Sequence, residues 1–286
     1  MKIIKPIVGI SKIIDNYEAV IAGFNGVLYN GAEVKAEALL ALKKCAEKGK
    51  KVVVLTNSAL RVSEIVGILA EQPLDLSFLT AIVSAGEILH YRLKYPETIG
   101  LSGRKYYNLG GNADFGIFSG LNFQKTNDLA NADFVFMGNL KLEAEDVNSY
   151  VGELEHACAL GLPLLCVGND LAEFSNGHEA VGCGAIAEQY AVLGGKILTF
   201  GKPQQDMLKY ATECLNTDAR QILFVGDSFA ADIKSGNLLG ADTVLVSKGI
   251  HVTFLGEGYI PDVEKARNLA ANFDAYSDYV ISGLRW

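Results

Sequence analysis

The sequence has few of the features that mark secreted, membrane or nucleic-acid-binding proteins. Its five cysteines are scattered and form no C-x-x-C pair, so neither a disulfide framework nor a zinc site is indicated. No apolar run approaches the length of a membrane-spanning helix, and residues 7–10 are too short for a signal peptide. The formal net charge is -8, without a basic stretch for nucleic acid. We expect a soluble, cytoplasmic protein that binds neither nucleic acid nor membrane.

Half of the 286 residues are hydrophobic, and short apolar runs alternate with segments of helical periodicity. Runs that end in glycine or polar residues predict strands at 19–24, 51–55, 79–84, 105–109, 133–137, 162–167, 197–200, 222–225, 243–246 and 279–281. Helical spacing predicts helices at 34–48, 62–69, 86–93, 143–160, 186–193, 205–215, 230–239 and 263–272. The alternation of strands and helices predicts an α/β protein with a doubly wound, mostly parallel sheet.

The pattern is interrupted at residues 95–103, where proline, glycine and serine replace the periodic residues. We interpret this segment as a crossing between domains. The block that follows is a β/α unit of its own, which predicts an inserted α/β domain at 96–195. Residues 1–95 and 196–286 then form the core domain, and the strand at 197–200 is expected to resume the main sheet.

Two carboxylates follow the most clearly predicted buried strand. Asp227 comes directly after Gly226, and Asp232 falls in the first turn of the next helix. The carboxyl ends of strands in open α/β sheets form the ligand crevice, where two carboxylates suit a hard cation such as Mg²⁺. The alternative is that Ser228 caps the helix and both aspartates are solvated.

Two further segments suggest an anion site. Thr56, Asn57 and Ser58 end a buried strand and open a helix, so their polar groups predict an anion cradle, although plain helix capping is the commoner use. Lys202 precedes Pro203 at the start of a helix, a favourable setting for phosphate. The alternative for Lys202 is an ordinary surface lysine.

The segment after the first long strand contains an Asn25-Gly26 dipeptide between the apolar runs 19–24 and 27–29. Asn-Gly between apolar runs is a strong tight-turn signal. We therefore expect a hairpin here.

Several segments occur in the order of a known family. They are 23–28, Leu-Thr-Asn-Ser around Thr56, Ser-Ala-Gly-Glu at 84–87, 182–186, Gly-Lys-Pro around Lys202, and 226–228 with Asp232. With these segments the chain resembles the haloacid dehalogenase superfamily of phosphohydrolases, in its class IIA sugar-phosphatase and nitrophenylphosphatase branch. The resemblance spans nearly the whole chain and implies a Rossmann-like core with an inserted α/β cap.

The resemblance also implies residue roles. Thr56, with Asn57 and Ser58, would bind the phosphoryl group. Lys202 would balance the charge of nucleophile and phosphate. Asp227, with Asp232, would bind Mg²⁺.

The first motif departs from the family pattern Asp-x-Asp-Gly-Val-Leu. Gly23 stands at the position of the nucleophile, and Asn25 stands at the position of the general acid/base. Glycine has no side chain with which to attack phosphorus, and an amide does not titrate as an acid or base. The resemblance therefore predicts a catalytically impaired protein that still binds phosphate or a small phosphorylated metabolite. The alternative is a phosphatase of low or altered activity.

The metal and cap assignments follow from the same resemblance. Mg²⁺ would be held by Asp227, Asp232 and the backbone carbonyl of Asn25, and more weakly because one carboxylate is missing. The cap would select the ligand through Asn169 and Asp170. By analogy with class IIA relatives, a homodimer through the cap is also expected.

Overall fold

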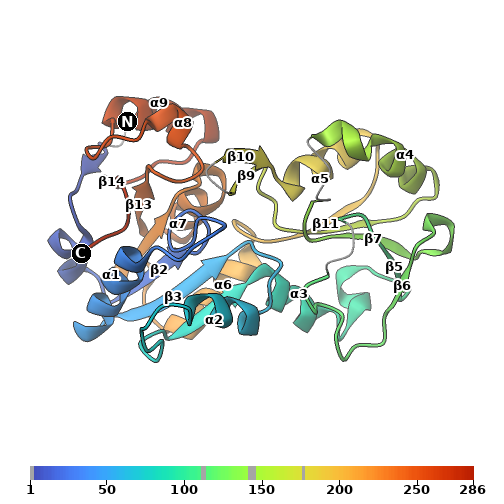
Figure 1. Cartoon of the computed structure of the whole chain (residues 1–286), viewed down its shortest axis with the longest axis horizontal. Helices are drawn as coiled ribbons and strands as arrows, with labels where there is room; N and C mark the ends of the chain where they lie inside the picture. The colour runs from blue at the N-terminus through green and yellow to red at the C-terminus, as the bar shows by residue number, and fades with distance from the viewer. Residues whose placement is uncertain (1–2, 111–113, 141–145, 176–177) are drawn as a thin grey trace.

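The computed structural model describes residues 3–110, 114–140, 146–175 and 178–286. Within these ranges the chain forms two parallel sheets that lie side by side, with a short antiparallel hairpin (Figure 1). One sheet occupies the left of Figure 1 and the other the right. This arrangement confirms the predicted α/β class.

The larger sheet has seven strands, and every strand pair in it is parallel. Its order is β1 (Lys5–Pro6), β14 (Tyr279–Ile281), β13 (Asp242–Val246), β12 (Ile222–Gly226), β2 (Ala19–Gly23), β3 (Lys51–Thr56) and β4 (Ala81–Ser84). The central strands β12, β2 and β3 are fully buried except at the first residue of β3. Their near-continuous apolar sequences are those of parallel strands covered on both faces.

The smaller sheet has five parallel strands. Its order is β11 (Ile197–Phe200), β8 (Leu164–Val167), β7 (Phe134–Met137), β5 (Lys105–Asn108) and β6 (Gln124–Thr126). The separate hairpin pairs β9 (Ala172–Ser175) with β10 (His178–Val181).

The prediction that residues 197–200 resume the main sheet is wrong. Strand β11 pairs with β8 in the smaller sheet, with Ile197 opposite Leu164. Strand β8, helix α5 (Cys183–Val192) and β11 form a crossover that returns to its own sheet. We keep the division into a core at 1–95 with 196–286 and an inserted unit at 96–195 as a proposal.

The helices follow the predicted positions, most with shifted ends, except that α8 (Val252–Leu255) was not predicted. They are α1 (Ala36–Glu47), α2 (Val62–Leu69), α3 (Ala85–Arg92), α4 (Val151–Ala159), α5, α6 (Gln205–Leu215), α7 (Lys234–Leu239), α8 (Val252–Leu255) and α9 (Val263–Phe273). The helix expected at 143–160 is shorter, since a 3₁₀ turn at 147–150 precedes α4 and 141–145 lie outside the described residues. The helix expected at 230–239 begins as a π-helical turn, Phe229–Ile233.

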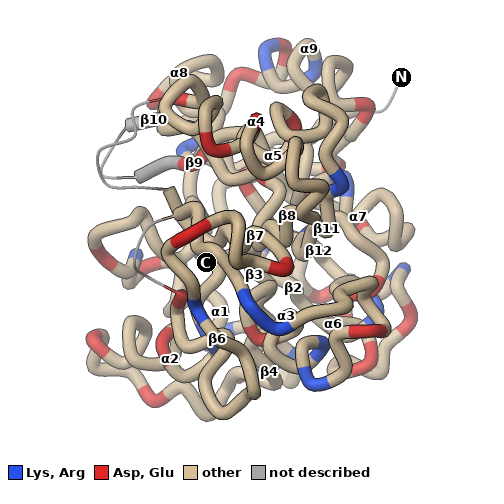
Figure 2. The backbone as a smooth tube through the Cα atoms, turned by 90° about the vertical axis from the view of Figure 1, so that its right-hand side faces the viewer, with Lys and Arg blue, Asp and Glu red and all other residues tan. Residues whose placement is uncertain are grey.

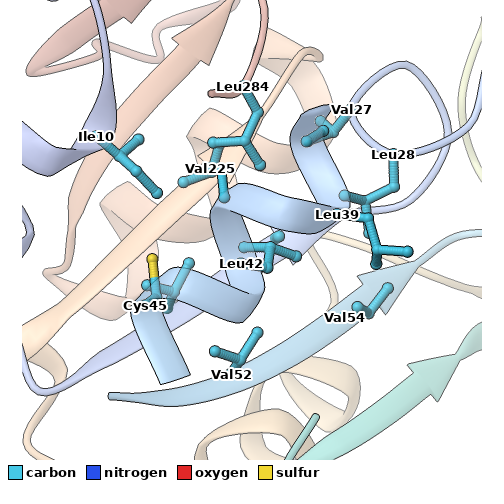
Figure 3. Close-up of a cluster of buried hydrophobic side chains, with 14 of the residues drawn as sticks. Ile10, Val27, Leu28, Leu39, Leu42, Cys45, Val52, Val54, Val225 and Leu284 are labelled. Atoms are coloured by element: carbon cyan, nitrogen blue, oxygen red, sulfur yellow. The ribbon is translucent and has the colours of Figure 1, made fainter. Parts of the chain in front are cut away.

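The segment after β2 is a compact loop, so the hairpin prediction is wrong. Gly26 takes the positive φ of 74° that Asn-Gly signals, but the amide of Leu28 donates to the carbonyl of Phe24 at 2.8 Å. Val27 and Leu28 are buried against α1 (Figure 3). Burial of these two side chains, instead of strand pairing, determines the path of the loop.

Helix α3 joins the two sheets. Leu89 on α3 belongs to one hydrophobic cluster with Val83 of β4 and with Phe136 and Leu165 of the smaller sheet. Because this shared core is contiguous, it fixes how the smaller sheet sits against the larger one. The loops at the end of β8 are thereby held near the carboxyl ends of the larger sheet's strands.

Charged residues of both signs are interspersed along the backbone (Figure 2). In the ranges that the structure describes, no helix is long and apolar enough to cross a membrane.

Helix α1 covers one face of the larger sheet. Its residues Leu39, Leu42 and Cys45 pack against Val52 and Val54 of β3 (Figure 3). Leu42 is fully buried, whereas Leu40 on the same helix is 45% exposed. The two leucines therefore form a matched pair for measuring this packing.

We predict that Leu42→Ala lowers the free energy of unfolding by about 2–5 kcal/mol, because it leaves a cavity in the core. Leu40→Ala should change it by less than about 0.5 kcal/mol. Urea unfolding followed by circular dichroism measures both. Equal effects of the two substitutions would contradict the assigned packing.

Candidate functional site

Three neighbouring strands end at the same edge of the larger sheet. β2 ends at Gly23, β3 at Thr56 and β12 at Gly226, and the parallel register sets these ends side by side. This is the edge at which open α/β sheets bind ligands. The candidate site is built from the residues that follow these strands and from the loops that reach them.

A buried ion pair lies at the centre of this site. The Nζ atom of Lys202 donates to Asp232 Oδ1 at 2.6 Å and to the carbonyl of Leu55 at 3.2 Å. Lys202 is only 5% exposed, so it is not the surface lysine that the sequence left possible. Burial lowers the pKa of Lys202, but Asp232 and Asp170 outweigh burial and raise it overall.

Asp232 also organises the turn after β12. Its Oδ2 atom accepts hydrogen bonds from the amides of Asp227 and Ser228, both at 3.1 Å. The Ser228 hydroxyl accepts from the amide of Ala231, as an N-cap residue does. Both oxygens of Asp232 thus have protein partners, and its role as a metal ligand stays a prediction.

Asp227 is buried in a tight enclosure. Its Oδ2 atom accepts from the amide of Ile250 at 2.8 Å. Gly26 and Gly249 pack so closely on this carboxylate that a side chain at either position would overlap it. Burial, reinforced by the charge of Asp232, raises the pKa of Asp227 to about 7.

The two first-motif positions lie in different environments. A Cβ atom at Gly23 would lie 3.5 Å from Asp232 Oδ1 and 3.2 Å from Val27 Cγ2. A longer side chain at position 23 would therefore start beside the Lys202–Asp232 pair. Asn25, by contrast, is exposed and forms a backbone bridge with Tyr29.

The hydroxyls of Thr56 and Ser58 accept backbone hydrogen bonds within the turn that leaves β3. Thr56 Oγ1 accepts from the amide of Ser58 at 3.1 Å, and Ser58 Oγ accepts from the amide of Leu60 at 3.2 Å. Helix capping by these residues, the alternative that the sequence left open, is wrong, because the N-cap of α2 is Arg61. Thr56 is buried at the strand end, next to the site, and its phosphate-binding role stays a prediction.

Asn57 connects the two sheets through its side-chain amide. Its Oδ1 atom accepts from the amide of Lys202 at 2.6 Å, and its Nδ2 atom donates to Asp170 Oδ2 at 2.8 Å. Nδ2 also lies 3.2 Å from Asn169 Oδ1. The structure thus brings Asn169 and Asp170, predicted from the inserted unit, to the carboxyl edge of the larger sheet.

The loop that carries Asn169 and Asp170 rests on the start of α5. The amide of Gly184 donates to the carbonyl of Asp170 at 3.0 Å. A side chain at Gly182 or Gly184 would overlap this loop, so the glycines permit the close approach. Burial, reinforced by Asp232, raises the pKa of the Asp170 carboxyl, although Lys202 and Asn57 act in the opposite direction.

Sequence reasoning missed two side chains near Asp227. The Nζ atom of Lys35 donates to the carbonyl of Gly26 at 2.5 Å. His251 Nε2 accepts from the amide of Phe229 at 3.2 Å, and burial lowers the pKa of His251 to about 4. Lys35 lies within a segment predicted as helix, and no local motif distinguishes it from other surface lysines.

Known proteins are similar to this chain in sequence. A HAD-hydrolase-like family model matches residues 199–271. The 5'-nucleotidase YutF of Bacillus subtilis is 24% identical over 270 residues, covering 92% of this chain and 99% of YutF. Mouse (Mus musculus) chronophin is 26% identical over 264 residues, covering 87% of each chain.

Solved structures share the fold. The crystal structure of a haloacid dehalogenase-like hydrolase from Brucella suis 1330 superposes with a TM-score of 0.80. It is 23% identical, and the match covers 96% of this chain and 98% of that one. The chain therefore has the fold of this haloacid dehalogenase-like hydrolase, and it is similar in sequence to phosphatase-related proteins of that kind.

The site offers few ligands for a metal ion. Among the described residues, no group of three or more His, Cys, Asp or Glu side chains could hold one. The carboxylate of Asp227 and the backbone carbonyl of Asn25 are hard oxygen donors of the kind that Mg²⁺ accepts together with phosphate. This donor set fits a weakly held divalent cation.

The pKa of Asp227 gives a pH-dependent prediction. The folded-state pKa, about 7, lies above the ordinary value of 3.8, so the folded state binds more protons and loses stability as pH rises between these values. Asp227→Asn removes this loss. We expect the variant to exceed the natural chain in unfolding free energy by on the order of 2 kcal/mol at about pH 8, and by less at about pH 5.

Urea unfolding of both proteins at the two pH values measures the difference. The pH dependence, and not the sign at one pH, is the decisive quantity. A difference between variant and natural chain that stays constant with pH would contradict the assignment.

Proposed function

We propose that the protein binds phosphate or a small phosphate monoester, such as a sugar phosphate, and does not hydrolyse it by the family mechanism. The observation that carries this proposal is Gly23. Its Cα faces the Lys202–Asp232 pair, where the family pattern has its nucleophilic aspartate. The buried Lys202 is present beside this position, but the side chain that would attack phosphorus is absent.

The chemistry follows from the two substitutions. The family reaction forms an aspartyl-phosphate that water then hydrolyses, which requires a carboxylate at position 23. Loss of a covalent nucleophile lowers turnover by on the order of a millionfold, with a remainder from binding and electrostatics. Asn25 is exposed and its amide does not exchange protons as an acid or base.

Binding is favoured by the groups that remain. Lys202 provides a buried ammonium, and Thr56 lies at the end of the adjacent strand. An anion beside Lys202 would meet one carboxylate fewer than in a chain with aspartate at position 23. Since like charges in a poorly solvated site repel strongly, the glycine reduces the cost of bringing in phosphate.

Mg²⁺ is part of the proposal as a weakly bound cation. The Asp227 carboxylate and the Asn25 carbonyl would hold it, and the bound ion would offset the negative charge of phosphate. The Asn169 and Asp170 side chains would contact the organic part of the ligand. A cytoplasmic location and a homodimer formed through the inserted unit complete the proposal.

Isothermal titration with inorganic phosphate and sugar phosphates tests binding. We expect heat at millimolar ligand, and about tenfold weaker binding in Thr56→Val, which removes one hydrogen-bonding hydroxyl. Thr212→Val on α6, where the hydroxyl bonds only to carbonyls of its own helix, is the matched control and should bind as the natural chain does. Absence of heat with every phosphate ligand would rule the proposal out.

Asp170 supports a second candidate, a phosphatase of low or altered activity. Its carboxylate reaches the site from the inserted unit and is half-buried beside Asn57. Asp170 is thus a third carboxylate at the described site, after Asp227 and Asp232, and it could take part in catalysis. If the protein is such a phosphatase, Asp170→Asn should abolish its turnover of p-nitrophenyl phosphate while leaving phosphate binding measurable. Turnover that persists in Asp170→Asn would exclude this role for Asp170.

A further inference from the structure

We infer that Lys35 is the resident cation of the Asp227 site, where its ammonium group offsets the carboxylate and weakens the binding of divalent metal ions. The inference assigns a function to a lysine that the first-motif pattern does not include. It rests on the proposed function and deepens it, because it gives a reason why Mg²⁺ is held weakly at the phosphate site.

Lys35 is held by hydrogen bonds from its backbone amide and from the end of its side chain. It is the residue before α1, and its backbone amide donates to the carbonyl of Leu28 at 2.7 Å. Its Nζ atom donates to the carbonyl of Gly26 at 2.5 Å. The loop at 24–35 therefore folds back so that this side chain lies along its own first-motif segment, and not in solvent.

Gly26 sets the position of this ammonium relative to Asp227. The Cα of Gly26 lies directly against the Asp227 carboxylate, with no room for a side chain between them. The ammonium of Lys35 thus contacts the residue that packs directly on this carboxylate. The two groups interact electrostatically: Asp227 favours the charged form of Lys35, although burial lowers the pKa of Lys35 overall.

Each aspartate of the β12 loop consequently has a lysine near it. Lys202 pairs directly with Asp232, and Lys35 lies close to Asp227. A divalent ion on Asp227 would be brought close to a fixed positive charge in a buried site, where repulsion is screened little. Gly23 also provides no carboxylate ligand. The charge of Lys35 and the absence of a carboxylate at Gly23 therefore both weaken metal binding.

Electron paramagnetic resonance with Mn²⁺ as the only added ligand tests the inference. Binding to the natural chain should be weak. Lys35→Gln removes the charge but keeps a donor for the Gly26 carbonyl, and Lys35→Met removes both. Each should bind Mn²⁺ at least about tenfold more tightly, a change of the size expected when a nearby like charge is removed.

Two controls separate the local effect from the change in net charge. Lys43→Met, on the outer side of α1 near Glu47, alters the net charge equally and should leave Mn²⁺ affinity within about twofold. Lys35→Arg retains the charge and should also leave it unchanged. Circular dichroism confirms that each variant folds, and Lys35→Gln carries the comparison if Lys35→Met does not fold.

Mn²⁺ affinity that is the same in the natural chain, Lys35→Gln and Lys43→Met would overturn the inference. Tight binding of Mn²⁺ by the natural chain would overturn it as well. The measurement is made without phosphate, so its failure is distinct from failure of the proposed function. If phosphate heats are absent in every protein while Lys35→Gln still gains Mn²⁺ affinity, only the proposed function fails.

Discussion

The buried ion pair between Lys202 and Asp232 is the interaction on which the site depends. Asp232 holds the turn after β12 through two backbone amides, while Lys202 reaches across to the end of β3. Removing one partner of a buried pair leaves an unpaired charge, which typically costs about 3–5 kcal/mol. The pair thus ties together strands β12 and β3 and the segment after β11. Gly23 lies beside the pair, and without a side chain it brings no further carboxylate to these two charges.

The inserted unit contributes to the same framework. Asn57 bonds to the backbone of Lys202 with one atom of its side chain and to Asp170 with another. Because α3 shares a core with both sheets, this contact does not depend on one hydrogen bond alone. The site therefore contains three carboxylates, Asp170, Asp227 and Asp232, near two lysines. Such a charge distribution favours a ligand that brings its own cation or that contacts Lys202 directly.

Local sequence signals predicted most strands of the larger sheet, but they did not predict every strand pairing or side-chain contact. The apolar run at 222–225 ends in glycine and could only be a buried strand, whereas the run at 197–200 looks the same and carries no sign of its pairing partner. Asn25-Gly26 signalled a turn correctly, but burial of Val27 and Leu28 against α1 prevented a hairpin. Asp227 and Lys202 were found because each follows a strand or opens a helix. The approach of Asp170 to Asn57, 113 residues away in the chain, and that of Lys35 to Asp227 arise from tertiary packing, which no local pattern encodes.

We propose that the chain keeps an anion site beside Lys202 and lacks the family chemistry because Gly23 has no side chain. Turnover of p-nitrophenyl phosphate with Mg²⁺ tests it directly, in the natural chain, in Asp227→Ala, and in Gly23→Asp/Asn25→Asp. We expect the natural chain to be no more active than Asp227→Ala, and the double variant to gain turnover. Activity of the natural chain that Asp227→Ala abolishes would contradict it, since another residue would then be the nucleophile.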